Sequence, residues 1–192
     1  MNFVLGQVLG EGSAGIVYQG TWNNRVVAIK KFVGQHTRHA EQEMKLLRTL
    51  NHPNIIQCFD HQQDRTDTYL IMEFIEGGTL FEYIQRSYDE MNTNSYWYKC
   101  KSIANDIAQG MNYLHERNVI HGDLKSHNIL LQLNEEQAKI CDFGLSKTMS
   151  DTRSHMTTPT KRYTSAQGTC NLSDPKMKLS LAIRGKVTNR EL

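Results

Sequence analysis

The N-terminal part of the chain alternates short apolar segments with turns, a pattern typical of strands joined in hairpins. Three such segments follow one another closely, at residues 3–10, 15–22 and 26–32. A further segment at 68–75, TYLIMEFI, reads as an apolar buried strand. Together these segments predict a small antiparallel sheet.

Helical patterns occur in three places. The first helix, between the third and fourth predicted strands, has an apolar side and a charged side, and Pro53 in NHPN ends it. Gly77-Gly78 then loosens the chain as a linker would. Beyond the linker the pattern predicts a short helix at 79–87 and a longer one at about 96–117, whose apolar side carries Ile103, Ile107, Gly110, Met111 and Leu114.

The segment after the long helix is irregular at first. VIHGDLKSHN reads as a loop, and short strands follow it at 128–133 and 138–143. Residues 146–168 are rich in Ser, Thr, Arg and Lys without periodicity, which predicts a mobile surface loop. The whole pattern predicts an α+β chain with a strand-rich unit at 1–76, a mainly helical unit at 77–176 and a divergent tail at 177–192.

Composition and charge narrow the class of partner. The chain has 192 residues and is 39% hydrophobic, enough to bury a core. Its net charge of +2 is too small to indicate nucleic acid or an anionic membrane as the main partner. The four cysteines are widely separated and form no CxxC pair, and no apolar run approaches membrane-spanning length. We therefore expect a soluble cytoplasmic protein with reduced thiols and neither a nucleic acid nor a membrane partner.

A glycine-rich turn, GEGSAGIV at 10–17, lies between the first two predicted strands. Missing side chains at Gly10, Gly12 and Gly15 would let backbone N–H groups approach phosphate oxygens. An ordinary glycine-rich hairpin has the same pattern, whereas a dinucleotide-binding fold needs a helix after the glycines, and here a strand follows. Lys30 follows in the apolar VAIK, where it either has an anionic partner or is a solvated edge-strand lysine.

Two aspartates lie beside apolar strands, Asp123 in HGDLKSHN and Asp142 in DFG. Each alone could be a turn former that bonds its own backbone. Together they supply what phosphoryl transfer needs, because one carboxylate can orient a substrate hydroxyl while a second, with an amide oxygen, holds Mg²⁺. Lysines can neutralise the phosphate charge.

Taken in order, the glycine loop, VAIK, HGDLKSHN and DFG resemble the protein kinase family over roughly three quarters of the chain. The resemblance implies a bilobal kinase fold, an antiparallel sheet plus one helix in the small lobe, and ATP and Mg²⁺ as cofactors. It also implies that Lys30 holds the α- and β-phosphates and pairs with a glutamate on the first helix. The spacing to His52-Pro53-Asn54 selects Glu43 over Glu41 as that partner.

The resemblance assigns the reactive groups as well. Asp123 resembles the catalytic base, and Asn128 and Asp142 resemble the magnesium ligands. Lys125 favours Ser and Thr as acceptors, since Ser/Thr kinases carry Lys two residues after the catalytic Asp, where it can reach the γ-phosphate. Cys141, directly before Asp142, should face the nucleotide pocket, either as a reactive thiolate or as a small buried hydrophobe.

The remaining site residues follow from the same resemblance. Gly10, Gly12 and Gly15 would cover the phosphates. Met72 falls at the gatekeeper position, and the backbones of Glu73 and Ile75 would bond adenine. The side chains expected to line the adenine pocket are Leu9, Val17, Ala28 and, at its floor, Leu130.

Within the family, LGEGSAG, HPNII, LIMEFIEGGTL, KICDFG and HMT are similar to mitogen-activated protein kinase kinase kinases of the TGF-β-activated kinase type. This similarity implies MAP kinase kinases as protein substrates, and we also expect an activating adaptor protein. The activation loop would then span about 146–170, with Ser154 and Thr157 as candidate phosphosites among many hydroxyl residues.

The chain also departs from the family pattern. Gly122 stands where most kinases have an arginine that grips a phosphorylated activation loop, which argues against control by that route. Asp174-Pro175-Lys176 stands in place of Ala-Pro-Glu, and the helices that complete the large lobe are absent from the sequence. We therefore expect an incomplete, C-terminally truncated second lobe and a partly uncovered apolar side on the 96–117 helix. Two functions stay open: a Ser/Thr kinase, or a catalytically weak or inactive kinase-like regulatory module.

Overall fold

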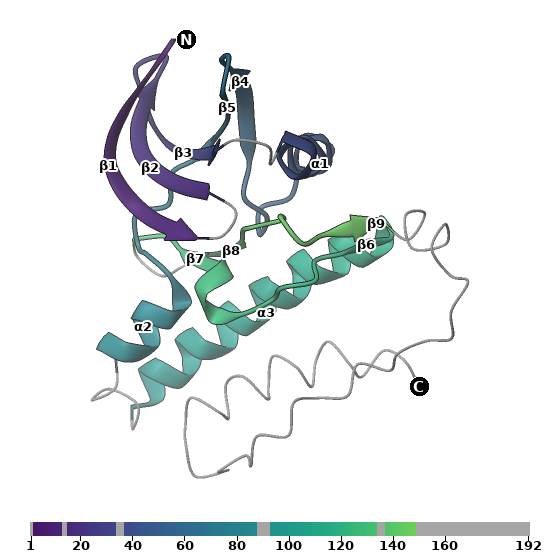
Figure 1. The fold of residues 1–192 in the computed structure, drawn as a ribbon. Helices are drawn as coiled ribbons and strands as arrows, with labels where there is room; N and C mark the ends of the chain where they lie inside the picture. Colours follow the sequence, from purple (N-terminus) through teal and green to yellow (C-terminus); the bar gives the residue numbers. More distant parts are fainter. Residues whose placement is uncertain (1, 13–14, 34–36, 88–92, 134–136, 149–192) are drawn as a thin grey trace.

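The computed structural model describes residues 2–12, 15–33, 37–87, 93–133 and 137–148 (Figure 1). The N-terminal unit is one antiparallel five-stranded sheet in the order β1-β2-β3-β5-β4. Its strands are β1 (Phe3–Gly12), β2 (Gly15–Trp22), β3 (Arg25–Val33), β4 (Cys58–Gln63) and β5 (Asp67–Glu73). One helix, α1 (Thr37–Leu47), is inserted between β3 and β4 and lies beside the sheet in Figure 1.

The first three strands form where the hydrophobic pattern predicts them. Asn23 and Asn24 have φ values of +49° and +60°, the left-handed conformation that a tight hairpin turn requires. Strand β4 was not predicted, because its sequence, CFDHQQ, contains mostly polar residues. It forms at the edge of the sheet, where a half-exposed strand tolerates polar side chains.

The second unit contains two helices, α2 (Leu80–Arg86) and α3 (Asn94–Glu116). Thr79 caps α2 in a capping box, since its side chain accepts from the Glu82 amide while the Glu82 carboxylate accepts from the Thr79 amide. Thr93 caps α3 with its side chain, which accepts a hydrogen bond from the Tyr96 amide. Both predicted helices are therefore present, and α3 begins two residues earlier than expected.

Two small antiparallel sheets follow the long helix. Strand β7 (Ile129–Leu131) pairs with β8 (Ala138–Ile140), and β6 (Val119–Ile120) pairs with β9 (Lys147–Thr148). A single 3₁₀ turn, η2 (Ser126–Asn128), precedes β7. The strand predicted at 138–143 ends at Ile140, because Asp142 takes a left-handed φ of +61° that a strand cannot accommodate.

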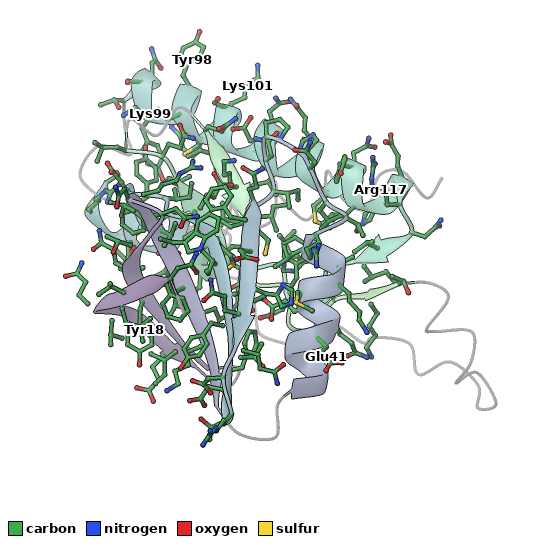
Figure 2. All side chains as sticks on the ribbon, turned by 90° about the horizontal axis from the view of Figure 1, so that it is seen from above. Tyr18, Glu41, Tyr98, Lys99, Lys101 and Arg117 are labelled. Carbon is green, nitrogen blue, oxygen red and sulfur yellow. The ribbon has the colours of Figure 1, made fainter. Side chains whose placement is uncertain are left out.

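One hydrophobic core joins the two units. Residues of α1, the 54–56 segment and β5 pack in the same cluster as the apolar side of α3 and strand β8. Ile103, Ile107, Gly110, Met111 and Leu114 are all buried. The expectation that this side of the helix would be partly uncovered is therefore wrong. The large hydrophobic side chains of α3 that do face solvent are Trp97 and Tyr98, and Figure 2 shows Tyr98 at the outer surface.

The predicted α+β class and the small antiparallel sheet with one helix are confirmed. Within the described ranges no helix is both long and apolar enough to cross a bilayer. The predicted loop at 146–168 and the tail at 177–192 lie outside the described residues, apart from Ser146, Lys147 and Thr148.

Gly77 tests the packing between the linker and the second unit. A Cβ atom on this buried residue would lie 2.4 Å from the carbonyl oxygens of Leu131 and Gln132, and backbone atoms cannot easily move away. We expect Gly77→Ala to lower the free energy of unfolding by about 1–3 kcal/mol, measured by urea denaturation. Gly12→Ala is the matched control, because a Cβ there meets nothing within 4 Å. Equal stability of the two variants would contradict this packing.

Candidate active site

A buried ion pair forms between the sheet and the helix. The Lys30 ammonium, on β3, lies 2.8 and 2.9 Å from the two carboxylate oxygens of Glu43 on α1. Lys30 is 5% exposed and Glu43 3%, so neither charge is left to water. Glu41 is exposed on the same helix (Figure 2). The structure thus pairs Lys30 with the glutamate that the spacing selects and does not leave it as a solvated edge lysine.

Asp142 reaches the same ammonium from the second unit. Its Oδ1 lies 3.0 Å from Lys30 Nζ, and its side chain is 40% exposed. Burial opposes the charge on Lys30, but the attraction of Glu43 and Asp142 outweighs it and raises the lysine pKa. Burial likewise opposes the charge on Asp142, but Lys30 outweighs it and lowers the pKa of that carboxyl. A cation and a half-open anion therefore face each other at neutral pH.

A second polar cluster surrounds Asp123. Its Oδ2 accepts from Lys125 Nζ at 2.6 Å and from Asn128 Nδ2 at 3.1 Å. The same Asn128 nitrogen donates to the Asp123 carbonyl at 2.8 Å, which fixes the amide orientation. The Asp123 side chain is 30% exposed, and the hydrogen bond to it raises the pKa of Lys125. The carboxylate is therefore held in place while part of it stays open to a substrate.

Backbone bonds bring the two clusters together. The Cys141 amide donates to the Asn128 carbonyl at 2.9 Å, next to the pairing of β7 with β8. Because its nitrogen is used by Asp123, Asn128 has its amide oxygen left for a metal, and Asp142 offers a partly exposed carboxylate. Oxygen donors of these two kinds suit Mg²⁺. In the part of the chain that the structure describes, no three His, Cys, Asp or Glu side chains converge as a complete metal site, so Mg²⁺ here would take further ligands from water and phosphate.

The glycine-rich segment is aligned with Lys30 across the first three strands of the sheet. Gly10 pairs with Val17 across β1 and β2, and Val17 pairs with Lys30 across β2 and β3. Gly15 has a φ of +133°, and a Cβ on it would lie 2.1 Å from the Lys31 carbonyl oxygen, so only glycine fits. Cβ atoms on Gly10 and Gly12 would meet nothing within 4 Å, which leaves their backbone open to an approaching phosphate.

The residues expected around adenine come from several strands, namely β1, β2, β3, β5 and β7. Ala28 on β3 is paired directly with Met72 on β5, and Met72 is buried in the core. Leu9 is 44% exposed on β1, and Leu130 on β7 is half-buried and bridges to Thr79. The Glu73 amide donates to the Gln57 carbonyl at 3.0 Å, so this amide already has a partner. These positions are compatible with the predicted pocket, and the binding roles, including that of Ile75, stay predictions.

Sequence reasoning did not single out His121. This buried imidazole lies 3.0 Å from the Cys141 carbonyl through Nε2, and its Nδ1 accepts from the Asp123 amide at 3.3 Å. Its ring contacts Phe143 edge to face, with centroids 4.9 Å apart. His121 therefore connects the Asp123 loop to the DFG segment. The only sequence signal was its place two residues before Asp123.

Two further residues, Cys141 and Gly122, bear on expectations drawn from the sequence. Cys141 is half-buried, and burial, followed by the neighbouring Asp142 carboxylate, raises the pKa of its thiol to about 12, which favours the protonated thiol over a reactive thiolate. Gly122 has a φ of +84°, and a Cβ on it would lie 2.7 Å from the Leu145 carbonyl oxygen. Ser146 Oγ also donates to the His121 carbonyl at 2.9 Å, so the residues after DFG pack closely on the Asp123 loop.

Comparison with known proteins identifies the family. The chain matches the protein kinase domain family over residues 3–176 and therefore belongs to it. It is 40% identical over 148 residues to a probable serine/threonine-protein kinase of Dictyostelium discoideum, covering 74% of this chain and 16% of that protein. It is 35% identical over 182 residues to wall-associated receptor kinase-like 10 of Arabidopsis thaliana, covering 91% of this chain and 23% of that protein.

A third relative bears on the finer assignment. Mitogen-activated protein kinase kinase kinase 7 of Drosophila melanogaster is 35% identical over 160 residues, covering 81% of this chain and 23% of that protein. The chain spans less than a third of the length of these relatives, at 16% and 23% of them. The predicted membership in the protein kinase family is thus confirmed.

The surroundings of His121 generate a prediction about its protonation. Burial lowers its pKa below the ordinary 6.5, partly offset by the bond to Cys141, and protonation would break the bond at Nδ1. Because the unfolded chain binds the proton more readily, this contribution to stability is complete above pH 6.5 and is lost as the pH falls toward the folded pKa.

We expect the His121 ring signals, assigned by NMR with His121→Gln, to titrate with a midpoint below 6.5 in the folded protein and near 6.5 in urea. A folded midpoint at or above the urea value would contradict the neutral imidazole.

Proposed function

We propose that this chain is a protein serine/threonine kinase domain that transfers the γ-phosphoryl group of ATP to a Ser or Thr hydroxyl. The observation that supports this most directly is the joining of two clusters by the Asn128–Cys141 backbone bond. One cluster is a buried cation beside a half-open carboxylate, and the other is a carboxylate held by an exposed lysine. Membership in the protein kinase family supports the same reaction.

Each group has a role in the transfer. The acceptor hydroxyl oxygen attacks the γ-phosphorus, its proton passes to Asp123, and the bond to the β-phosphate oxygen breaks to release ADP. Lys30 faces the α- and β-phosphates and Lys125 the γ-phosphate, so both compensate negative charge. Asp142 and Asn128 would hold Mg²⁺, which would supply positive charge to compensate the charge that develops on the phosphate oxygens. Positioning and electrostatics therefore supply most of the rate enhancement.

The proposal predicts the effect of removing individual charges. We expect Asp123→Asn to lower transfer of labelled γ-phosphate by about 100- to 10,000-fold, the range for loss of a general base.

Binding of Mg²⁺-ATP should raise the melting temperature by mass action, and Lys30→Met should remove most of that rise.

Lys31→Met is the matched control for Lys30→Met. Lys31 is the next residue of β3 but pairs with Asp67 at 3.0 Å, away from the two clusters. Equal thermal shifts in all three proteins would refute the nucleotide site. An intact shift without any transfer would favour the alternative function, a kinase-like regulatory module that binds nucleotide without catalysis.

We further propose that the substrate is a MAP kinase kinase and that the chain acts in the cytoplasm with an activating adaptor protein. This rests on the similarity to a mitogen-activated protein kinase kinase kinase and on the motifs LGEGSAG, HPNII and KICDFG. Lys125, whose ammonium contacts the Asp123 carboxylate, favours Ser and Thr as acceptors. The candidate phosphosites Ser154 and Thr157 lie outside the described residues.

A substrate comparison tests this finer proposal. We expect kcat/KM for a catalytically inactive MAP kinase kinase to exceed that for a generic Ser/Thr peptide by about 10-fold or more, because docking contacts outside the acceptor add binding energy. Phosphoamino-acid analysis should find Ser or Thr only. Equal values for the two substrates, or transfer to Tyr, would contradict the assignment.

A further inference from the structure

Two of the described ion pairs connect the small sheet to the segment that contains β8 and Asp142. At one end of this segment Asp142 meets Lys30 of β3 at 3.0 Å. At the other end Lys139, in β8, lies 2.9 Å from the carboxylate of Glu73, at the end of β5. Lys139 and Asp142 are only three residues apart. The position of Asp142 therefore depends on what holds β8.

The Glu73–Lys139 pair is nearly enclosed and has two partners on one oxygen. The side chains are 14% and 10% exposed. Glu73 Oε1 accepts from Lys139 Nζ at 2.9 Å and from the Gln57 amide at 2.7 Å, while the Glu73 amide returns a bond to the Gln57 carbonyl. One carboxylate thus joins the end of β5 to the residue before β4 and to β8. Charge-assisted bonds of this kind are stronger than neutral ones.

Hydrogen bonds link β8 to the 54–56 segment. The Ile140 amide donates to the Asn54 carbonyl and the Ile56 amide to the Ile140 carbonyl, both at 2.9 Å. The Asn54 side chain adds a bond to the Ala138 carbonyl at 2.9 Å. These bonds make β8 and the 54–56 segment a single rigid body, from which Asp142 follows after one residue. A shift of the β5 end against this body would change where Asp142 lies relative to the Glu73 backbone.

A surface pocket of about 200 Å³ adjoins the ion pair, and Lys139, Gln57 and Ile55 are among the residues that line it. None of the residues predicted to bind nucleotide lines it. Solvent therefore reaches this side of the ion pair, and the two charged side chains are the direct link between the end of β5 and β8 here.

We propose that Lys139 is a positioning residue for nucleotide binding. Resting on the kinase function proposed above, Lys30 and Asp142 must exchange their mutual contact for phosphate and Mg²⁺ when the ligand enters. The Glu73–Lys139 pair takes no part in that exchange. It keeps the adenine-binding backbone after β5 in register with Asp142 while the other cross-link is replaced.

The test compares Lys139→Met, which removes the charge at similar length, with Lys139→Arg, which retains it. Titration calorimetry should show Mg²⁺-ATP binding weakened by about 5- to 30-fold in Lys139→Met, a coupling of ordinary size, and near wild type in Lys139→Arg. Lys31→Met, which breaks the ion pair with Asp67 at 3.0 Å, should leave the affinity unchanged. Unfolding in urea separates these effects from general destabilisation.

A second measurement needs no ligand. Amide hydrogen exchange at Gln57 and Glu73 should accelerate in Lys139→Met, with α3 amides unchanged, because the carboxylate that bonds Gln57 loses its cation. Unchanged Mg²⁺-ATP affinity in Lys139→Met would overturn the proposal, whatever its transfer rate. Unchanged hydrogen exchange at both the Gln57 and the Glu73 amides would overturn it as well. If the wild-type protein transfers no phosphate, the kinase function fails, and the exchange measurement still decides whether Lys139 holds this region.

Discussion

The described structure depends on a buried lysine that requires two carboxylates from different parts of the chain. An ammonium with 5% exposure is very costly unless its charge is compensated. Glu43 must therefore be presented by α1, and Asp142 by the segment after β8, both within 3.0 Å of one atom. The sheet, the helix and the second unit are each held where they satisfy this one charge. The ion pair is thus a constraint on the arrangement as much as a source of stability.

Burial divides the site into two halves with different properties. The Lys30–Glu43 half is closed, and both of its partners come from the N-terminal unit. The Asp123–Lys125 half is partly open, with side-chain exposures of 30% and 50%. The buried Lys30 suits contact with phosphate groups that do not react. The partly exposed Asp123 suits contact with a hydroxyl group that must enter, react and leave. The neutral His121 between the halves connects them without adding another charge.

Most helices and strands with a regular pattern of apolar and polar residues could be predicted from the sequence. Strands β1 to β3 and helices α2 and α3 follow from periodicity and turn residues, which are local signals. The pairing of Lys30 with a glutamate of α1 followed from the resemblance to the protein kinase family, and motif spacing selected Glu43 within it. Strand β4 was missed because its residues are polar and only the neighbouring β5 makes it a strand. His121 and the Glu73–Lys139 pair were missed because their partners are brought close by the fold, over 20 and 66 residues of sequence.

The conformation of Gly122 limits the mutational paths open to this protein. Any side chain at this position meets a left-handed backbone, which costs about 1–3 kcal/mol, and a carbonyl oxygen of Leu145 at 2.7 Å. Both penalties come from the main chain, so repacking of nearby side chains cannot relieve them. An arginine at 122 would therefore need a simultaneous change in the path of residues 143–146. Variation at position 122 is therefore restricted by the main chain around Asp123 and not by the side chains that surround it.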